Sequence, residues 1–128
     1  MAGEKIFEEK VKRYLESKGI YRLGTPKNKM SVTPVGYYEK RFANAYTGAG
    51  LPDMHIVIKG ISVEAELKQA TGRPSDLQVI KIQRIIESGG IAFILYPKDF
   101  ELFKDLINEI IKENYDCKAV ERSGRFGK

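Results

Sequence analysis

The chain has 128 residues, of which 42% are hydrophobic and 30% charged, so it suits one globular domain with a modest core and leaves no room for a second. The formal net charge of +5 favours a polyanionic partner such as nucleic acid. One cysteine, Cys117, and one histidine, His55, exclude an intramolecular disulfide and a structural zinc cluster. With no bilayer-spanning apolar stretch and no signal-peptide core, the sequence predicts a cytoplasmic protein without a membrane partner.

Residues 4–18 are predicted to form a helix that ends before Gly19. Apolar side chains recur there at helical spacing, and they are Phe7, Val11, Tyr14 and Leu15. Glu8 borders this apolar stripe, whereas Glu9 points away from it. Glu4 also lies near the stripe, and the plain interpretation of Glu8 is a solvent-exposed helix carboxylate.

Residues 20–50 are rich in Gly, Pro, Thr and Asn, and at most short strands are predicted around 20–23 and 31–35. Five basic residues against the acidic Glu39 give this segment a local charge of +4, and tyrosines are interleaved with them. Cations neutralise phosphates and tyrosines stack on bases, so the segment is a candidate nucleic-acid surface. Its candidate residues are Arg22, Lys27, Lys29, Tyr37, Tyr38, Lys40 and Arg41. The alternative is an irregular loop whose aromatic residues anchor it to the core or to a dimer interface.

An isolated acid, Asp53 in the segment G-L-P-D, is followed thirteen positions later by Glu66, and Lys68 comes two positions after that. Alternating apolar and polar side chains predict two antiparallel strands, residues 54–58 and 61–68, joined by a tight Lys-Gly turn. This pairing places Asp53 across from Glu66 or close to it. Two carboxylates on neighbouring strands can hold a hard divalent cation, and the lysine reaches the same point.

The second of these strands has one apolar face and one charged face, and Glu64, Glu66 and Lys68 share the charged one. The plain alternative is a solvated strand face on which Glu66 and Lys68 form a weak surface ion pair. Glu64 is a further candidate, as a supporting carboxylate or in place of Glu66. His55 is expected to be structural, because a single histidine makes no catalytic triad.

After a loop that contains Arg73, residues 75–88 are predicted to form a helix closed by two glycines. Its apolar residues are expected to lie largely inward, and they are Leu77, Ile80, Ile82, Ile85 and Ile86. Ser75 and Gln78 form an S-x-x-Q capping box, which is a purely structural role at the helix start. Gln78 also follows the acidic motif in the sequence.

The remaining elements are a buried strand and a final amphipathic helix. Residues 91–96 are a short apolar run that suits a buried strand. Residues 99–114 carry one continuous apolar stripe, formed by Phe100, Phe103, Leu106, Ile107, Ile110 and Ile111. The chain from about residue 117 is a basic tail that is expected to be mobile and to touch nucleic acid.

In order and spacing, these segments resemble the PD-(D/E)xK nuclease superfamily and, within it, the compact virus-type replication-repair nucleases called VRR-NUC domains. The resemblance covers about residues 4–97 and includes F-E-E-K-V, G-A-G-L-P-D, V-E-A-E-L-K, G-R-P-S-D-L-Q and G-G-I-A-F-I-L. It implies an α/β fold with a restriction-endonuclease-like core, in which helices flank a small mixed β-sheet. Residues 1–128 would then form a single nuclease domain.

The resemblance implies a Mg²⁺ site, open to Mn²⁺ as well, with Glu8, Asp53, Glu66 and the backbone carbonyl of Leu67 as ligands. Asp53, Glu66, Lys68 and Gln78 would be the catalytic residues. Lys68 would orient or deprotonate the attacking water or stabilise the transition-state charge, and these roles remain alternatives. The Arg73 loop would add to the nucleic-acid surface.

The expected activity is therefore that of a metal-dependent endonuclease that hydrolyses DNA phosphodiester bonds and leaves 5′-phosphate and 3′-hydroxyl ends. The resemblance also implies a homodimer, and two sites on a dyad suit branched or structured DNA such as a Holliday junction or a flap. Two alternatives remain open. One is a non-catalytic basic nucleic-acid-binding module, and the other is a nuclease of the same superfamily that acts on duplex DNA, single strands or RNA.

Overall fold

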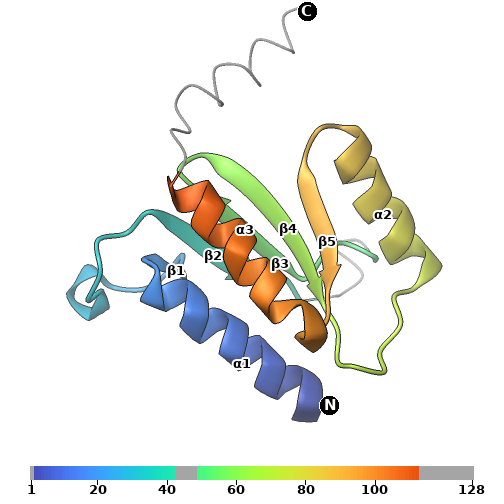
Figure 1. Ribbon diagram of the computed structural model, residues 1–128, viewed down its shortest axis with the longest axis horizontal. Helices are drawn as coiled ribbons and strands as arrows, with labels where there is room; N and C mark the ends of the chain where they lie inside the picture. Colours follow the sequence, from blue (N-terminus) through green and yellow to red (C-terminus); the bar gives the residue numbers. More distant parts are fainter. Residues whose placement is uncertain (1, 43–48, 113–128) are drawn as a thin grey trace, which may run out of the picture.

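The computed structural model describes residues 2–42 and 49–112, which form a five-stranded mixed sheet with three α-helices (Figure 1). The predicted α/β class, a small mixed sheet flanked by helices, is confirmed. The elements follow one another as α1 (Ala2–Ser17), β1 (Ile20–Arg22), η1 (Lys27–Lys29), β2 (Gly36–Lys40), β3 (Met54–Ile58), β4 (Ile61–Leu67), α2 (Asp76–Glu87), β5 (Ile91–Leu95), η2 (Pro97–Asp99) and α3 (Phe100–Lys112). The two η elements are short 3-10 turns.

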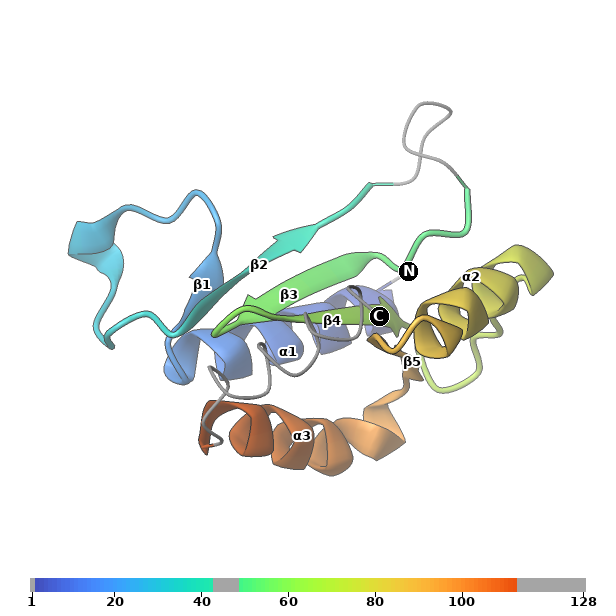
Figure 2. The ribbon, with the colours of Figure 1, turned by 90° about the horizontal axis from the view of Figure 1, so that it is seen from above.

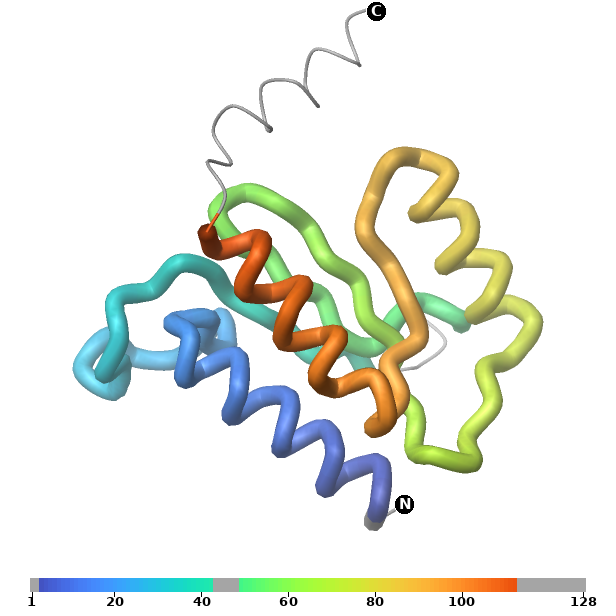
Figure 3. The backbone as a smooth tube through the Cα atoms, in the orientation of Figure 1, coloured from blue at the N-terminus to red at the C-terminus, as the bar shows by residue number. Residues whose placement is uncertain are grey.

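The strands lie in the order β1-β2-β3-β4-β5, so each strand pairs with its neighbours in the sequence. β3 is antiparallel to both β2 and β4, whereas β1 runs parallel to β2 and β4 runs parallel to β5. Figure 3 shows how the chain leaves β4, passes through α2 and returns to β5, as parallel neighbours require. Because β4 and β5 are parallel, the residues that follow them, Lys68 and Tyr96, lie at the same edge of the sheet.

The turn between β3 and β4 has the conformation of a tight hairpin. Its residues Lys59-Gly60 adopt φ of 49° and 85°, the left-handed values that a type I′ turn requires. The resulting register pairs Met54 with Ala65. One step further along this register, Asp53 comes opposite Glu66, as the sequence predicted.

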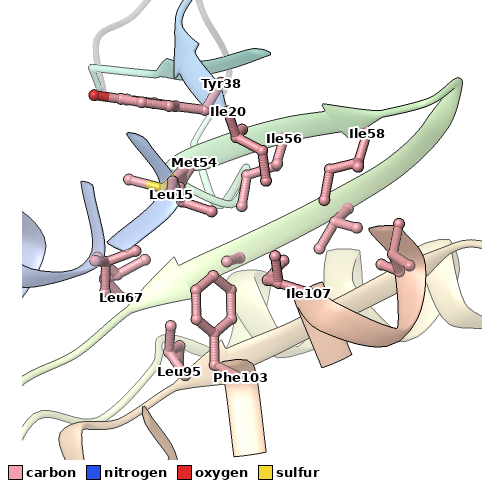
Figure 4. Close-up of a cluster of buried hydrophobic side chains, with 14 of the residues drawn as sticks. Leu15, Ile20, Tyr38, Met54, Ile56, Ile58, Leu67, Leu95, Phe103 and Ile107 are labelled. Carbon is pink, nitrogen blue, oxygen red and sulfur yellow. The ribbon is translucent and has the colours of Figure 1, made fainter. Parts of the chain in front are cut away.

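α1 and α3 lie side by side on one face of the sheet (Figure 2). The ring of Tyr14 in α1 meets Phe100 and Phe103 edge-on, with centroids 6.0 and 6.2 Å apart. Beneath the helices, the alternate residues of β3 and β4 form the centre of the core (Figure 4), each at most 2% exposed: Met54, Ile56, Ile58, Ile61, Val63, Ala65 and Leu67. The predicted apolar faces of the first and last helices both contribute to this core.

One strand lies further along the chain than predicted. A strand was expected near residues 31–35, whereas β2 begins at Gly36. The reason is a close approach of two backbones, because a Cβ at Gly36 would lie only 2.3 Å from the carbonyl oxygen of Val57. A glycine that has the appearance of a loop residue therefore starts the strand, and Tyr37 and Tyr38 belong to β2 rather than to an irregular segment.

α2 buries less of its apolar surface than predicted. Leu77, Ile80 and Ile86 were expected to face inward, but they are 42, 51 and 45% exposed, and Val79 is 49% exposed. Of the residues of α2, only Ile82 is buried. α2 packs against β5, the edge strand, which covers just one side of the helix. The four exposed residues do not share one side of α2, because Leu77 and Ile86 are nine positions, about two and a half turns, apart.

The remaining expectations concern a membrane-spanning segment and the basic tail. None of the helices within the described residues is both long and apolar enough to cross a membrane. The basic tail from about residue 117 lies outside the described residues, as do residues 43–48 of the predicted nucleic-acid segment.

Candidate active site

Asp53 and Glu66 are held together by two reciprocal hydrogen bonds to the backbone. The amide nitrogen of Asp53 donates to Glu66 Oε1 at 3.1 Å, and the amide nitrogen of Leu67 donates to Asp53 Oδ1 at 3.2 Å. Each carboxylate therefore accepts a bond from the backbone of the opposite strand. The hairpin register alone produces this arrangement, which confirms the predicted proximity of the two acids.

Glu66 is a buried carboxylate with three different donors around it. Its residue is 4% exposed. Besides Asp53, it receives a hydrogen bond at Oε2 from Gln78 Nε2, at 3.1 Å, and Lys68 Nζ lies 3.4 Å from the same oxygen. The side chains of Lys68 and Glu66 are 16 and 5% exposed, so they do not form the solvated surface pair that the alternative interpretation assumed.

Gln78 uses both ends of its amide. Its Oε1 accepts a hydrogen bond from the Ser75 backbone nitrogen at 2.9 Å, and its backbone nitrogen donates to Ser75 Oγ at 3.1 Å. These two bonds form the predicted capping box at the start of α2. The amide nitrogen is left to reach Glu66, so the cap and the contact with the acidic pair coexist in one side chain.

Glu8 of α1 approaches the pair through a lysine. Lys40, the last residue of β2, pairs with Glu8 Oε1, and its Nζ lies 3.8 Å from Asp53 Oδ2. Lys12 Nζ lies 2.9 Å from the second oxygen of Glu8. The ammonium group of Lys40 thus stands between two of the three predicted metal-binding carboxylates. The sequence assigned Lys40 to a nucleic-acid surface instead, and its side chain is 15% exposed.

Burial and mutual repulsion set the charge state of the two acids. Desolvation, followed by the charge of Glu66, raises the pKa of Asp53 to about 7, although Lys40 and the Leu67 amide oppose the shift. Burial also raises the pKa of Glu66 above its ordinary value, against the effect of Lys68. Burial would raise the pKa of Glu8 as well, but the hydrogen bonds from Lys40 and Lys12 lower it on balance.

The donor set suits a divalent cation in chemical kind. Carboxylate oxygens are what Mg²⁺ and Mn²⁺ prefer, and two buried acids that repel one another would be relieved by a cation between them. Within residues 2–42 and 49–112, no three acidic, histidine or cysteine side chains converge closely enough to hold a metal. A cation here would therefore rely on Asp53, Glu66 and backbone or water oxygens, such as the predicted Leu67 carbonyl. Glu8 could join only after Lys40 moves away.

A second buried carboxylate, Glu64, supports the site without entering it. It is 7% exposed and pairs with both Arg41 and His55. Arg41 also donates from Nη1 to the carbonyl oxygen of Pro52 at 2.8 Å, and its backbone nitrogen donates to the carbonyl oxygen of Asp53 at 2.7 Å. Arg41 thereby anchors the chain immediately before β3. Sequence reasoning placed Arg41 on a nucleic-acid surface, and only the register of β2 against β3 reveals this partner set.

The other predicted nucleic-acid residues do not form one surface. Tyr38 is 2% exposed and donates from its hydroxyl to Glu16 Oε2 at 2.9 Å, so its assignment to base stacking is wrong. Burial and this bond raise the pKa of Tyr38. Arg22 pairs with Glu39 at 3.3 Å. Tyr37 is partly buried in β2.

The remaining three cations of this set are exposed, but they lie apart. Lys27 and Lys29 belong to η1, which lies at the end of the molecule opposite to α2 in both Figure 1 and Figure 2. Arg73 lies in the loop that leads into α2. Lys27 and Lys29 therefore do not form one binding surface with Arg73. Of these three residues, only Arg73 is close in sequence to the acidic pair.

Comparison with known proteins adds no identification. No protein-family model, curated protein or solved structure matches the chain. The assignment of function rests on the geometry of the site.

The raised pKa of Asp53 predicts a pH-dependent stability. An acid whose pKa is higher in the folded state, about 7 against 3.8, binds its proton more tightly there, so stability falls as the pH rises through that window. Asp53→Asn removes this loss. We expect the variant to gain about 2 kcal/mol over the parent at pH 8 relative to pH 4, roughly half of the full shift, as measured by thermal unfolding. Asp105→Asn, at an exposed position of α3, should show no such gain, and equal behaviour of both variants would contradict the prediction.

Proposed function

We propose that the protein is a metal-dependent nuclease that hydrolyses DNA phosphodiester bonds. The observation that carries this proposal is the reciprocal Asp53–Glu66 arrangement with Lys68 and Gln78 on the same Glu66 oxygen. A buried pair of acids costs stability unless something compensates its charge, and such pairs are typical of sites that bind cations or transfer protons. Lys68 and Gln78 are held on that pair. They provide a positive charge and a hydrogen-bond donor, which phosphodiester hydrolysis needs in addition to the cation.

Each side chain has a defined task in this proposal. When bound, Mg²⁺ would polarise the phosphoryl oxygen and lower the pKa of a coordinated water. Asp53 and Glu66 would hold it, with their positions fixed by the hairpin backbone. The ammonium group of Lys68 stabilises negative charge that develops on the phosphoryl oxygens or orients the attacking water. Gln78 keeps Glu66 turned toward Asp53.

The proposed substrate is structured or branched DNA, and the proposed assembly is a homodimer. The net charge of +5 supports a polyanionic substrate. Exposed apolar residues on α2 support self-association, since Leu77, Val79, Ile80 and Ile86 are 42 to 51% exposed. Two copies would bring two acidic pairs to one branched substrate.

The central test is cleavage by the parent and by matched variants. A panel of duplex, single-stranded, flap and four-way-junction DNA, together with an RNA strand, is incubated with Mg²⁺, with Mn²⁺ or with a chelator. We expect cleavage only with metal, and a loss of about 10²–10³-fold or more in Asp53→Ala and Lys68→Ala, because each removes charge stabilisation at the transition state. The exposed Lys112→Ala serves as the control. Cleavage by both variants at the parent rate would falsify the proposal, and metal-independent binding without cleavage would favour the non-catalytic module.

The two uses of Gln78 can be separated by a pair of substitutions. Ser75→Ala breaks the capping box but keeps the Gln78–Glu66 bond, whereas Gln78→Ala removes both. We expect both variants to lose about 1 kcal/mol of stability in thermal unfolding. Only Gln78→Ala should also lose cleavage rate, by about tenfold or more, because Glu66 then lacks its fixed orientation. Equal rates in the two variants would show that Gln78 acts as a cap alone.

Metal entry should require Lys40 to withdraw from the carboxylates. Lys40→Met removes the resident ammonium group, so the metal-free protein should melt lower while its affinity for Mg²⁺ rises, by about tenfold, since no cation competes for Glu8 and Asp53. Calorimetric titration and the metal dependence of the melting temperature measure both effects. Lys12→Met is the matched control, because among the acids of the site Lys12 contacts Glu8 but not Asp53. An unchanged or weaker affinity for Mg²⁺ in Lys40→Met would refute this competition.

A further inference from the structure

A hollow of about 710 Å³ lies between the loop that follows β4 and the chain that follows β5. The walls come from residues 70–74 on one side and 96–98 on the other. Figure 3 shows these two stretches, the yellow-green loop and the orange turn, at the same edge of the sheet. The volume lies within the range of ordinary ligand pockets.

This hollow, called here the edge groove, lies next to the proposed catalytic lysine, Lys68. The Lys68 backbone nitrogen donates to the Leu95 carbonyl oxygen at 3.0 Å, which ties the ends of β4 and β5 together. Gly72 lines the groove, and a Cβ at that position would lie 3.5 Å from the Cβ of Lys68. A strand that lies in the groove would therefore pass beside Lys68, whose Nζ lies 3.4 Å from Glu66 Oε2.

The chemistry of the edge groove is that of a nucleic-acid site. It offers an aromatic ring, Tyr96, and two exposed cations, Arg73 and Lys98, and none of the described residues that line it is acidic. Lys98 Nζ lies over the Tyr96 ring, 5.9 Å from its centroid, so the aromatic ring and a cation for phosphate are close together. The neighbouring hollow between β5 and α3 differs in charge, since Asp99 and Glu109 are among the residues that line it.

We propose that the edge groove binds an unpaired nucleic-acid strand next to the bond that is cut, which rests on the proposed function and specifies its substrate. One base stacks on Tyr96, while Arg73 and Lys98 neutralise the adjoining phosphates. A base inside a duplex cannot offer its face in this way, because its neighbours already cover both sides. The groove therefore selects substrates with a free strand, such as a flap or the open arms of a junction, over a continuous duplex.

The test measures binding without divalent metal, so that no cleavage takes place. Fluorescence anisotropy follows a labelled single strand, a flap of the same sequence and the matched duplex. Tyr96→Leu should weaken single-strand and flap binding by about tenfold, the usual effect of losing one stacked base, and should leave duplex binding unchanged. Tyr96→Phe keeps the ring and should bind as the parent does. Arg73→Gln and Lys98→Gln, at exposed positions that do not endanger folding, should each reduce the salt dependence of single-strand binding by somewhat less than one counterion.

The control is Lys27→Gln combined with Lys29→Gln, which removes the same charge at the opposite end of the molecule. The proposal is overturned if this double variant loses as much single-strand binding as Arg73→Gln with Lys98→Gln, or if Tyr96→Leu weakens the duplex and the single strand equally. It is also overturned if the parent prefers the duplex. Failure of the proposed function would appear in a different measurement. In that case the parent and Asp53→Ala would show the same cleavage with metal, while the binding results would stay as expected.

Discussion

The pairing of β3 with β4 is the constraint on which the whole site depends. It places two acids opposite one another and directs the backbone amide of each strand at the carboxylate of the other. Charge-assisted hydrogen bonds of this kind offset part of the cost of burying the acids, but not their mutual repulsion. The sheet therefore holds Asp53 and Glu66 in an arrangement that neither residue would adopt in solution. In the proposed function, such a site would bind a cation readily, because folding has already brought the acids together.

Three lysines lie beside the acids of the site, and each is supplied by a different part of the chain. Lys40 ends β2, Lys68 follows β4, and Lys12 reaches Glu8 from α1. These ammonium groups offset part of the cost of burying the acids when no metal is bound. The same arrangement explains why net charge alone is a poor guide to where a nucleic acid could bind. Several of its basic residues neutralise internal acids, so only the exposed ones, such as Arg73 and Lys98, are available to phosphates.

Local patterns were sufficient to predict the hairpin, its turn, the helix cap and the proximity of Asp53 to Glu66, since each depends on residues close in sequence or on a fixed register. Long-range partners were not predictable in this way. The role of Arg41 at Pro52 and Glu64 follows only from where β2 runs, and the start of β2 is marked by Gly36, which resembles a loop residue.

The outer face of α2 shows a second limit of sequence reasoning. Helical spacing identifies which side chains share a face, but it does not say whether the rest of the fold is wide enough to cover that face. Ile80 and Ile82 are two positions apart and point to nearly opposite sides of α2, so Ile82 is buried, whereas Ile80 is 51% exposed because no strand lies beyond β5 to cover its side. The position of an edge strand depends on the complete topology, which no single periodic pattern contains.

The two-residue turn at Lys59-Gly60 sets more than the shape of a hairpin. Side chains alternate between the faces of a strand, so a shift of one residue in the β3–β4 register would turn Leu67 toward Asp53 and carry Glu66 into the apolar core. The length of this loop, at the far end of the hairpin, therefore decides whether the two acids face each other. Insertions that most surface loops tolerate would erase the site here while leaving every one of its residues in the sequence.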